Sequence, residues 1–321
     1  RAIKADWNSQ TALWTVQVQN PDTGEVSALT CSFLSMCPGY YKYDKGHRPD
    51  FKGEADFKGP IVHPQHWPHD LHYAGKKVIV IGSGATAVTL VPQLAKIAAH
   101  VTMLQRSPTY VASRPDSDKI ANVLSAILPQ NLAYKITRAK NIAYSAYVYN
   151  AAQKKPKKMK ALLRKMALKD LGKDYDVDTH FNPSYNPWDQ RLCVVPNSDM
   201  FVAIRQGRAD VVTNTIDCFT QNGIMLSDGQ KLEADIIITA TGIEVIAFGE
   251  MSVSVDGADV PPQETFGYKG MMFSSVPNMT SVFGYTNASW TLRADLISRY
   301  MCRLINYMDE RGVDIAMPTA P

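Results

Sequence analysis

The run Lys77-Val78-Ile79-Val80-Ile81-Gly82-Ser83-Gly84-Ala85-Thr86-Ala87 decides the fold. A short apolar run rich in β-branched residues predicts a buried strand, and it ends in the pattern G-x-G-x-x-A. A helical pattern follows from Ala85 to about Ala98, and His100–Gln105 reads as the next strand. A strand, glycine turn, helix and strand within about 30 residues predict a βαβ unit that binds a dinucleotide.

Each position of the glycine turn has a physical reason. Gly82 allows the tight turn, Gly84 lets the backbone approach a pyrophosphate, and Ala87 lets the helix pack closely on the strand. The phosphates then lie on the helix N-terminus, where unpaired N–H groups favour negative charge. We expect the cradle to consist of Gly82, Ser83, Gly84, Ala85, Thr86 and Ala87. The alternative is a glycine-rich turn without a ligand.

The end of the second strand selects the cofactor. An acidic residue there would bind the ribose 2′-hydroxyl of NADH, but this chain has Arg106 and Ser107. A guanidinium can bind a 2′-phosphate with two hydrogen bonds, and the serine can add a third. The sequence therefore favours NADPH, with a solvated arginine as the alternative.

The composition excludes several classes of protein. Of 321 residues, 45% are hydrophobic and 20% are charged, and the net charge of +4 is too small to indicate nucleic acid binding. No apolar run approaches the length of a membrane span. The cysteines have no C-x-x-C spacing, which argues against a disulfide frame, a metal site and a disulfide reductase. These dispersed thiols favour a cytoplasmic protein, and they are Cys31, Cys37, Cys193, Cys218 and Cys302.

Other segments give a coarse outline. Alternation predicts a hairpin from strands at 13–19 and 26–36, and residues 41–72 read as an ordered loop. Residues 117–178 have a helical pattern without strand signals. Strands are expected again at 209–213 and 235–239, and a last helix at 292–310.

A second motif precedes the glycine turn. Phe57, Gly59, His63, Trp67 and Pro68 form the pattern F-x-G-x-x-x-H-x-x-x-W-P. With the 82–87 turn, the segment 105–108 and the strand end 240–242 in this order, the chain resembles class B flavoprotein monooxygenases of the Baeyer–Villiger type.

The resemblance implies an α/β flavoprotein with two dinucleotide-binding domains. The Rossmann-like NADPH domain would span 75–244, with a helical insertion at about 117–190. The FAD domain would comprise 1–45 and 245–321, and 46–74 would be a linker that carries the fingerprint. No second G-x-G-x-x-G is present. We therefore expect an incomplete FAD domain, cut from a longer protein at both ends.

The resemblance also implies roles for single residues. Arg191 would stabilise a flavin C4a-peroxide and help hold NADP+, unless it only pairs with Asp189. Gly242 would lie at the cofactor. Asn287 would contact the flavin ring and Trp290 would line the substrate pocket. The alternative for these two is an ordinary helix entry.

The fingerprint has two readings as well. In the first, His63 and Trp67 support domain movement and cofactor handling, and Phe57 is an anchor. In the second, the segment is only a loop in which an aromatic side chain packs on its own histidine. Pro38 departs from the family, because it removes an N–H group near the expected flavin.

The implied function is NADPH- and O2-dependent oxygenation that uses FAD. The substrate would be a ketone, a sulfide or a thioamide. One alternative is an N- or S-oxygenating monooxygenase without ketone activity. Another is a truncated piece without catalysis that binds NADPH or nothing.

A basic run extends from Lys154 to Lys160, and Arg164, Lys165 and Lys169 follow it. It is a solvated helix face or a peripheral contact with the inner face of the cell membrane.

Overall fold

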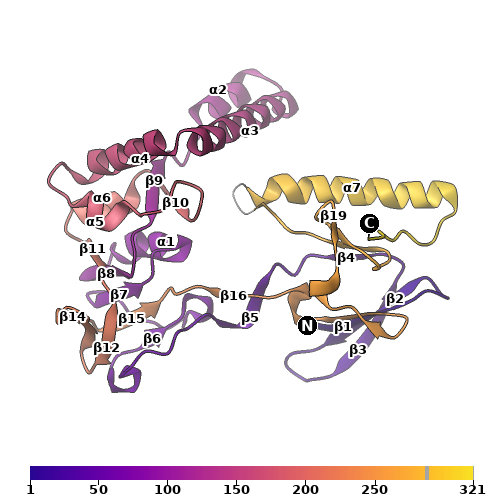
Figure 1. The fold of residues 1–321 in the computed structure, drawn as a ribbon, viewed down its shortest axis with the longest axis horizontal. Helices are drawn as coiled ribbons and strands as arrows, with labels where there is room; N and C mark the ends of the chain where they lie inside the picture. The colour runs from indigo at the N-terminus through magenta and orange to yellow at the C-terminus, as the bar shows by residue number, and fades with distance from the viewer. Residues whose placement is uncertain (286–288, 321) are drawn as a thin grey trace. The chain divides into compact units, whose positions relative to one another are not determined.

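The computed structural model describes residues 1–285 and 289–320, which form two compact units (Figure 1). The larger unit spans Lys45–Gly242, and the smaller one combines Arg1–Asp44 with Ile243–Pro321. The segment 46–74, expected as a linker, instead belongs to the larger unit. One of its strands extends the sheet of that unit, so it is not a free connection.

A five-stranded sheet organises the larger unit. All neighbouring pairs are parallel, and the strand order is β11-β8-β7-β15-β6. The strands are β6 (Ile61–Val62), β7 (Lys77–Ile81), β8 (His100–Gln105), β11 (Ala209–Thr213) and β15 (Ile236–Thr239). Strands β7, β8, β11 and β15 lie where the sequence predicts them. A parallel sheet buries both faces, which explains the continuous apolar runs of β7 and β15.

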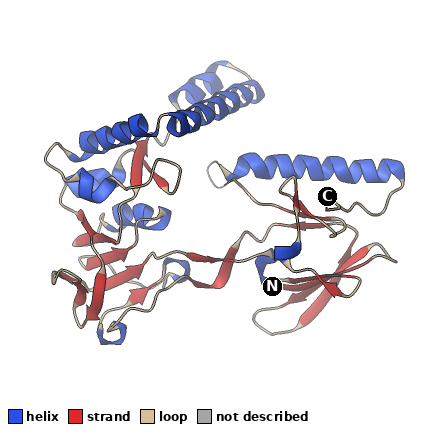
Figure 2. Cartoon of the chain, in the orientation of Figure 1, coloured by secondary structure: helices blue, strands red, loops and turns tan. Residues whose placement is uncertain are grey.

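Different layers cover the two faces of this sheet. Val78 and Val80 face helices α1 (Ala85–Leu94) and α6 (Asp199–Arg205), whereas Ile79 and Ile81 face the opposite side. That side carries an antiparallel sheet of β12 (Ile216–Thr220), β13 (Gly223–Leu226) and β14 (Lys231–Glu233) (Figure 2). The fold is therefore α/β, with helices on one face and a three-stranded sheet on the other.

The helical segment contains α2 (Lys119–Ile127), α3 (Gln130–Lys154), α4 (Pro156–Leu171) and α5 (Val177–Phe181). Two strands that the sequence analysis missed bracket it. These are β9 (Tyr110–Arg114) and β10 (Leu192–Pro196), and they pair in parallel. Helix α1 ends at Leu94 instead of Ala98, because the chain turns at Ala95.

The smaller unit contains a sheet in the order β18-β17-β1-β2-β3. Its core holds Trp7 and Trp14, whose ring centroids lie 5.4 Å apart. The second strand predicted at 26–36 is interrupted, because its last residues pair with β21 instead of β2. The strands are β1 (Ala2–Asn8), β2 (Leu13–Gln19), β3 (Val26–Cys31), β4 (Leu34–Met36), β17 (Ser252–Val255), β18 (Ala258–Asp259), β19 (Gly267–Tyr268), β20 (Met272–Phe273) and β21 (Met279–Ser281).

The last helix of the smaller unit is α7 (Trp290–Arg311), which starts two residues before the predicted helix. Its N-cap residue is Ser289. The remaining elements are β5 (Tyr41–Gly46), β16 (Ile243–Val245) and the short 3-10 helices η1 (Glu54–Asp56), η2 (Pro64–His66), η3 (Phe248–Glu250) and η4 (Pro262–Glu264).

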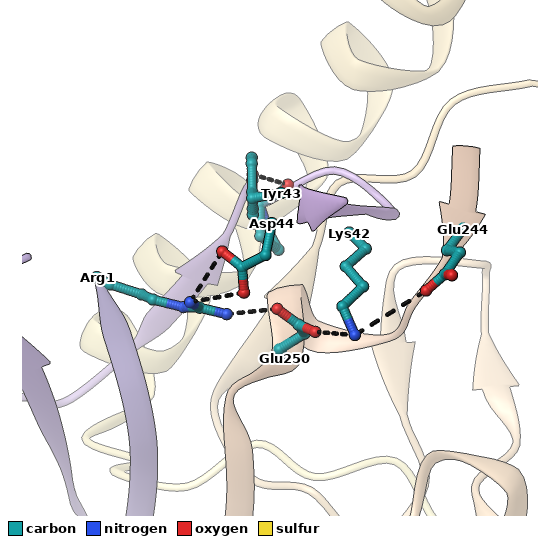
Figure 3. Close-up of polar contacts among 7 residues, drawn as sticks. Arg1, Lys42, Tyr43, Asp44, Glu244 and Glu250 are labelled. Carbon is teal, nitrogen blue, oxygen red and sulfur yellow. Dashed lines mark hydrogen bonds and ion pairs between the residues drawn. The ribbon is translucent and has the colours of Figure 1, made fainter. Parts of the chain in front are cut away.

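An ion-pair network joins three segments of the smaller unit (Figure 3). Glu250 accepts from Arg1 and from Lys42, and the Lys42 contact is 3.1 Å long. Arg1 also pairs with Asp44 at 3.0 Å, and Lys42 lies 3.9 Å from Glu244. These contacts fix strand β5 against β16, its partner in a two-stranded sheet.

Candidate dinucleotide-binding site

Three residues predicted to bind the cofactor, and the fingerprint residue His63, follow the carboxyl ends of parallel strands. His63 comes after β6, Gly82 after β7, Arg106 after β8 and Gly242 after β15. Parallel strands end at the same edge, so these residues share one edge of the sheet. Strands β8 and β15 lie on either side of β7, and ligands of open α/β sheets bind at such a switch point.

The turn after β7 has room only for glycine at its first position. Gly82 has φ of 125°, and a Cβ atom there would lie 2.3 Å from the carbonyl oxygen of Ala240. Its N–H donates to the carbonyl of Leu104 at 2.8 Å. Gly82 thus brings the turn against the ends of β15 and β8.

The N-terminus of α1 is open to a ligand. Its N-cap is Gly84, which makes no side-chain cap, and the first turn carries no acidic residue. Ala85 and Thr86 are exposed, whereas Ala87 is completely buried against the sheet. Free N–H groups and the helix dipole at this end fit the phosphates of a dinucleotide.

The Ser83 side chain lies inside the protein. It is buried, and its hydroxyl lies 3.0 Å from that of Thr109. Its carbonyl oxygen accepts a weak bond from the Cys193 thiol at 3.8 Å. The Ser83 hydroxyl is therefore engaged inside the protein.

Arg106 and Ser107 are exposed directly after β8. Within the described part of the chain, the Arg106 guanidinium has no hydrogen-bond or ion-pair partner. Its donors are therefore available to a ligand. Gln105, which the sequence analysis gave no role, anchors this strand end. Its side-chain NH2 donates to the His180 carbonyl and the Thr213 hydroxyl, each at 2.8 Å. A buried glutamine at the end of an apolar strand was the available signal.

Arg191 reaches the glycine turn from a distant part of the sequence. One guanidinium nitrogen lies 3.3 Å from the position that a Cβ atom of Gly84 would take. The Tyr185 hydroxyl donates to the Arg191 carbonyl at 2.8 Å, and the Tyr110 hydroxyl donates to the Tyr185 carbonyl at 2.7 Å. Burial raises the pKa of Tyr110 to about 12, so this tyrosine stays a neutral donor.

The alternative reading of Arg191 was an ion pair with Asp189. In the described structure, the Asp189 carboxylate instead accepts from the side-chain amide of Asn186 at 3.0 Å. No Arg191–Asp189 ion pair occurs among these residues, and the Arg191 side chain is exposed. Arg191 therefore presents its charge to the turn.

The first half of the fingerprint packs into the core of the larger unit. Phe57 is buried in the hydrophobic cluster between the parallel sheet and the three-stranded sheet. A Cβ atom on Gly59 would lie 2.1 Å from the Asp235 carbonyl and 2.8 Å from the Phe57 ring. Phe57 and Gly59 thus seat the segment beneath the start of β15.

His63 bridges the ends of two strands. Its Nδ1 accepts from the N–H of Gln65 at 3.2 Å, so the proton is on Nε2, which donates to the Gly242 carbonyl at 3.1 Å. The same carbonyl accepts from the His47 N–H at 3.1 Å. Burial lowers the pKa of His63. Gly46 leaves the room for the ring, because a Cβ there would meet it at 2.0 Å.

The loop interpretation required the Trp67 ring to pack on His63, and no such ring contact occurs among the described residues. The Trp67 ring meets Tyr73 edge to face at a centroid distance of 6.3 Å, beside the core on the helical face of the sheet. Pro68 is exposed.

One predicted site residue, Trp290, lies among the described residues of the smaller unit. Trp290 stacks on Tyr40 with centroids 5.1 Å apart and also contacts Phe283. Asn287 lies outside the described residues.

The described residues of the smaller unit form no counterpart of the glycine turn in the larger unit. After β4, the segment Cys37-Pro38-Gly39 leads into strand β5 and not into a helix. Within residues 1–44, 243–285 and 289–320, no strand passes through a glycine turn into a helix. These residues therefore hold no complete cradle for the FAD pyrophosphate.

The basic run lies at the end of α3 and along α4. The inner face of α4 is buried through Leu163, Ala167 and Leu171. Arg164 pairs with Asp178 at 2.6 Å, and Lys160 donates to the Pro183 carbonyl at 2.5 Å. No described helix has the length and apolarity that a membrane span requires.

Known proteins resemble the chain along its whole length. The FAD-containing monooxygenase EthA of Mycobacterium tuberculosis is 54% identical over 322 residues, which cover 100% of this chain and 65% of EthA. AlmA of Acinetobacter baylyi, described as a probable FAD-binding monooxygenase, is 46% identical over 99% of this chain and 64% of AlmA. The chain thus spans about 65% of the length of these relatives.

Solved structures share the fold. The open crystal structure of cyclohexanone monooxygenase has a TM-score of 0.78 at 19% identity, covering 99% of this chain and 70% of that one. The structure of OTEMO in complex with FAD and NADP has a TM-score of 0.76 at 21% identity, covering 99% and 68%.

The sequence pattern of one family covers most of the chain, from residue 2 to residue 307, and its description is flavin-binding monooxygenase-like. This match and the 54% identity to EthA indicate the same family as the glycine turn and the fingerprint. This chain therefore belongs to the flavin-binding monooxygenase-like family.

Proposed function

We propose that the chain forms the NADPH-binding part, and a portion of the FAD-binding part, of an NADPH- and O2-dependent monooxygenase. The observation that carries this proposal is the position of the Arg191 guanidinium. It lies 3.3 Å from the Cβ position of Gly84, at the open N-terminus of α1. A positive side chain and free N–H groups converge there on the place of a pyrophosphate.

Within this proposal, the larger unit binds and orients NADPH. The turn at 82–87 takes the pyrophosphate, and Arg106 and Ser107 take the 2′-phosphate of the adenosine half. Arg191 lies directly before β10, after the helical segment in the sequence, and adds positive charge beside the turn. Gly242 and His63 shape the neighbouring end of β15.

FAD, when bound to the whole protein, supplies the chemistry that accepts hydride from NADPH and activates O2. The residues described here do not complete its site, so their part is to present the nicotinamide cofactor. Arg191 can stabilise negative charge that develops beside the turn, because a guanidinium keeps its charge at any physiological pH. Asn287 and Trp290 stay proposals for the flavin contact and the substrate pocket.

The proposed reaction inserts one oxygen atom into a ketone or adds it to the sulfur of a sulfide or thioamide. Trp67 and Pro68 complete the fingerprint typical of Baeyer–Villiger enzymes, which supports the ketone reaction. An N- or S-oxygenating monooxygenase is the second candidate. A piece that only binds NADPH is the third, and the missing FAD cradle favours it for the 321 residues alone.

Two measurements on the purified 321-residue chain test this proposal. Calorimetric titration should give a lower Kd for NADP+ than for NAD+. The absorbance spectrum should lack flavin bands after purification, and added FAD should not remain bound through gel filtration. If neither nucleotide binds, the proposal fails. Stoichiometric flavin would refute the incomplete FAD site but not the NADPH site.

The proposal also covers where the protein acts. Free thiols at dispersed positions support a reducing, cytoplasmic environment. The basic run at 154–169 supports a peripheral contact with the inner face of the cell membrane, through attraction to anionic lipids.

A further inference from the structure

Charge is distributed very unevenly along the chain. Twelve Lys and Arg residues lie between positions 119 and 169, and no Asp or Glu lies among them. The whole chain has a net charge of only +4, so its remaining residues are net acidic. The positive charge is thus concentrated on the helices α2, α3 and α4.

The first two of these helices also expose apolar side chains. We call α2 and α3 together the α2–α3 hairpin. Of the 29 large hydrophobic residues exposed in the described chain, ten lie in the hairpin. They are Ile120, Val123, Ile127, Leu132, Tyr134, Ile136, Ile142, Tyr144, Tyr147 and Tyr149. Ile127 is 70% exposed and Tyr147 is 72% exposed. Scattered apolar residues are normal on a surface, but so many in one hairpin indicate a contact.

The hairpin hardly contributes to the core of the larger unit. Helix α2 has no buried residue, and the 25 residues of α3 have two, Ala133 and Ala152. Polar contacts also join the two helices. Asp118 caps α2 through the N–H groups of Ile120 and Ala121, and it also pairs with Lys140 from α3. The ten exposed apolar side chains are not buried in any contact between the two helices.

We propose that the α2–α3 hairpin inserts its apolar side chains into the surface of an anionic lipid bilayer. Helices that lie in a membrane interface combine exposed aliphatic and aromatic side chains with basic residues and few acidic ones. Ile120, Val123 and Ile127 lie on one face of α2, at spacings of three and four residues. Tyrosines suit the headgroup level, because their rings are apolar and their hydroxyls stay hydrated.

Other occupants fit the hairpin less well. A second copy of the hairpin would place like charges against each other, which costs free energy. Nucleic acid would satisfy the lysines, but exposed isoleucine, valine and leucine side chains gain nothing from phosphates. A lipid surface satisfies the positive charge and the apolar side chains together.

This inference deepens the membrane contact proposed for the basic run and rests on it. The run at 154–169 supplies attraction, but the apolar inner face of α4 is buried in the core. Insertion therefore needs another element, and the neighbouring hairpin has the exposed side chains. The inference does not depend on monooxygenase activity.

Co-sedimentation of the 321-residue chain with vesicles tests the proposal. Vesicles of phosphatidylcholine with about 30 mole per cent phosphatidylglycerol imitate an anionic membrane surface and should bind the protein. Vesicles of pure phosphatidylcholine should bind it at least about tenfold more weakly. The double variant Val123→Ser/Ile127→Ser should lose about tenfold in affinity for the anionic vesicles. Its matched control is Val26→Ser/Leu29→Ser, which removes aliphatic side chains of similar exposure, 50% and 62%, from strand β3. This control should bind like the wild type.

Further arms separate the possible failures. Replacing Lys154, Lys155, Lys157 and Lys158 by Gln should weaken binding and its dependence on salt. If these changes matter and Val123→Ser/Ile127→Ser does not, the basic run acts alone and the insertion is refuted. If the wild type does not bind anionic vesicles, the membrane contact of the basic run and the insertion of the hairpin are both refuted, whatever the outcome of the NADP+ titration. Binding of single-stranded RNA at lower protein concentration than vesicles, or a dimer that the Ser variants dissociate, would also overturn the insertion.

Discussion

The Nε2–H group of His63 donates a hydrogen bond to the carbonyl oxygen of Gly242, with 3.1 Å between the two heavy atoms. This bond connects the end of β6 to the end of β15, 179 residues away in sequence. The neutral ring is required by a second bond, in which Nδ1 accepts from the Gln65 N–H, because a protonated ring could still donate to Gly242 but could no longer accept from Gln65. A proton added to Nδ1 would face that N–H group and break the bond to it.

The first prediction concerns pH. Burial lowers the pKa of His63 from its ordinary value of 6.5, so the unfolded chain takes up this proton at a higher pH than the folded chain. The free energy of unfolding should therefore decrease as the pH falls from about 7 through 6.5 towards the folded pKa. Urea unfolding of wild type and His63→Gln between pH 8 and 5 (roughly the range in which histidine titrates) measures this, and the variant should show the weaker decrease.

His180 provides the control for this experiment, because burial lowers its pKa too. Its Nδ1 contacts the Thr213 hydroxyl, away from the fingerprint. His180→Gln should leave the His63 share of the pH dependence intact. Identical pH profiles for wild type and His63→Gln would contradict the neutral bridge.

The second prediction concerns the glycine turn. Gly82→Ala should abolish measurable NADP+ binding and destabilise the fold, because the added Cβ would lie 2.3 Å from the Ala240 carbonyl. Gly75→Ala is the matched control, since Gly75 also has positive φ, 68°, but has no atom within 4 Å of the added Cβ. Gly75→Ala should lower the free energy of unfolding by about 1–2 kcal/mol, because the backbone there is strained for alanine, and it should leave NADP+ binding unchanged. Equal effects of both changes on binding would rule out the close approach as the reason.

The third prediction concerns cofactor choice. Arg106→Ala should weaken NADP+ binding by about 1.5–3 kcal/mol and leave NAD+ nearly unaffected, because the lost hydrogen bonds are charge-assisted and specific to the 2′-phosphate. Calorimetric titration with both nucleotides measures it. Arg303→Ala, which makes the same charge change on helix α7, should affect neither. Equal losses for the two nucleotides would show that Arg106 does not contact the phosphate.

The fourth prediction concerns Arg191 in a full-length protein that contains this chain. Arg191→Ala should keep NADPH oxidation measurable but release hydrogen peroxide in place of product. Losing about 3 kcal/mol of electrostatic stabilisation slows product formation on the order of a hundredfold. The measurement is product formed per NADPH consumed, together with hydrogen peroxide release.

Stability separates this role from a structural one. Because Arg191 is exposed and Asp189 bonds to Asn186 instead, Arg191→Ala should not change the midpoint of urea unfolding. Asp189→Ala should leave product formation coupled to NADPH oxidation. A coupled but less stable Arg191→Ala variant would make the arginine a structural residue.

Local sequence was sufficient for the elements around the glycine turn. Strands β7 and β8 and the start of α1 follow from apolar runs, glycine positions and helical spacing within 29 consecutive residues, from Lys77 to Gln105. Strands β9 and β10 could not be found in this way. Their residues pair over 82 positions, as Tyr110 does with Leu192, and neither strand shows a turn or hairpin that would reveal its partner.

The sequence by itself determined the dinucleotide turn, the basic residue after β8 and the family fingerprint, because each depends on residue types at fixed short spacings. Only the tertiary structure decided which of these residues meet. It buried the Ser83 hydroxyl against Thr109, brought Arg191 to Gly84 and joined His63 to Gly242. Those contacts arise because parallel strands far apart in sequence end at one edge of the same sheet, and neighbouring positions in the sequence do not specify that pairing.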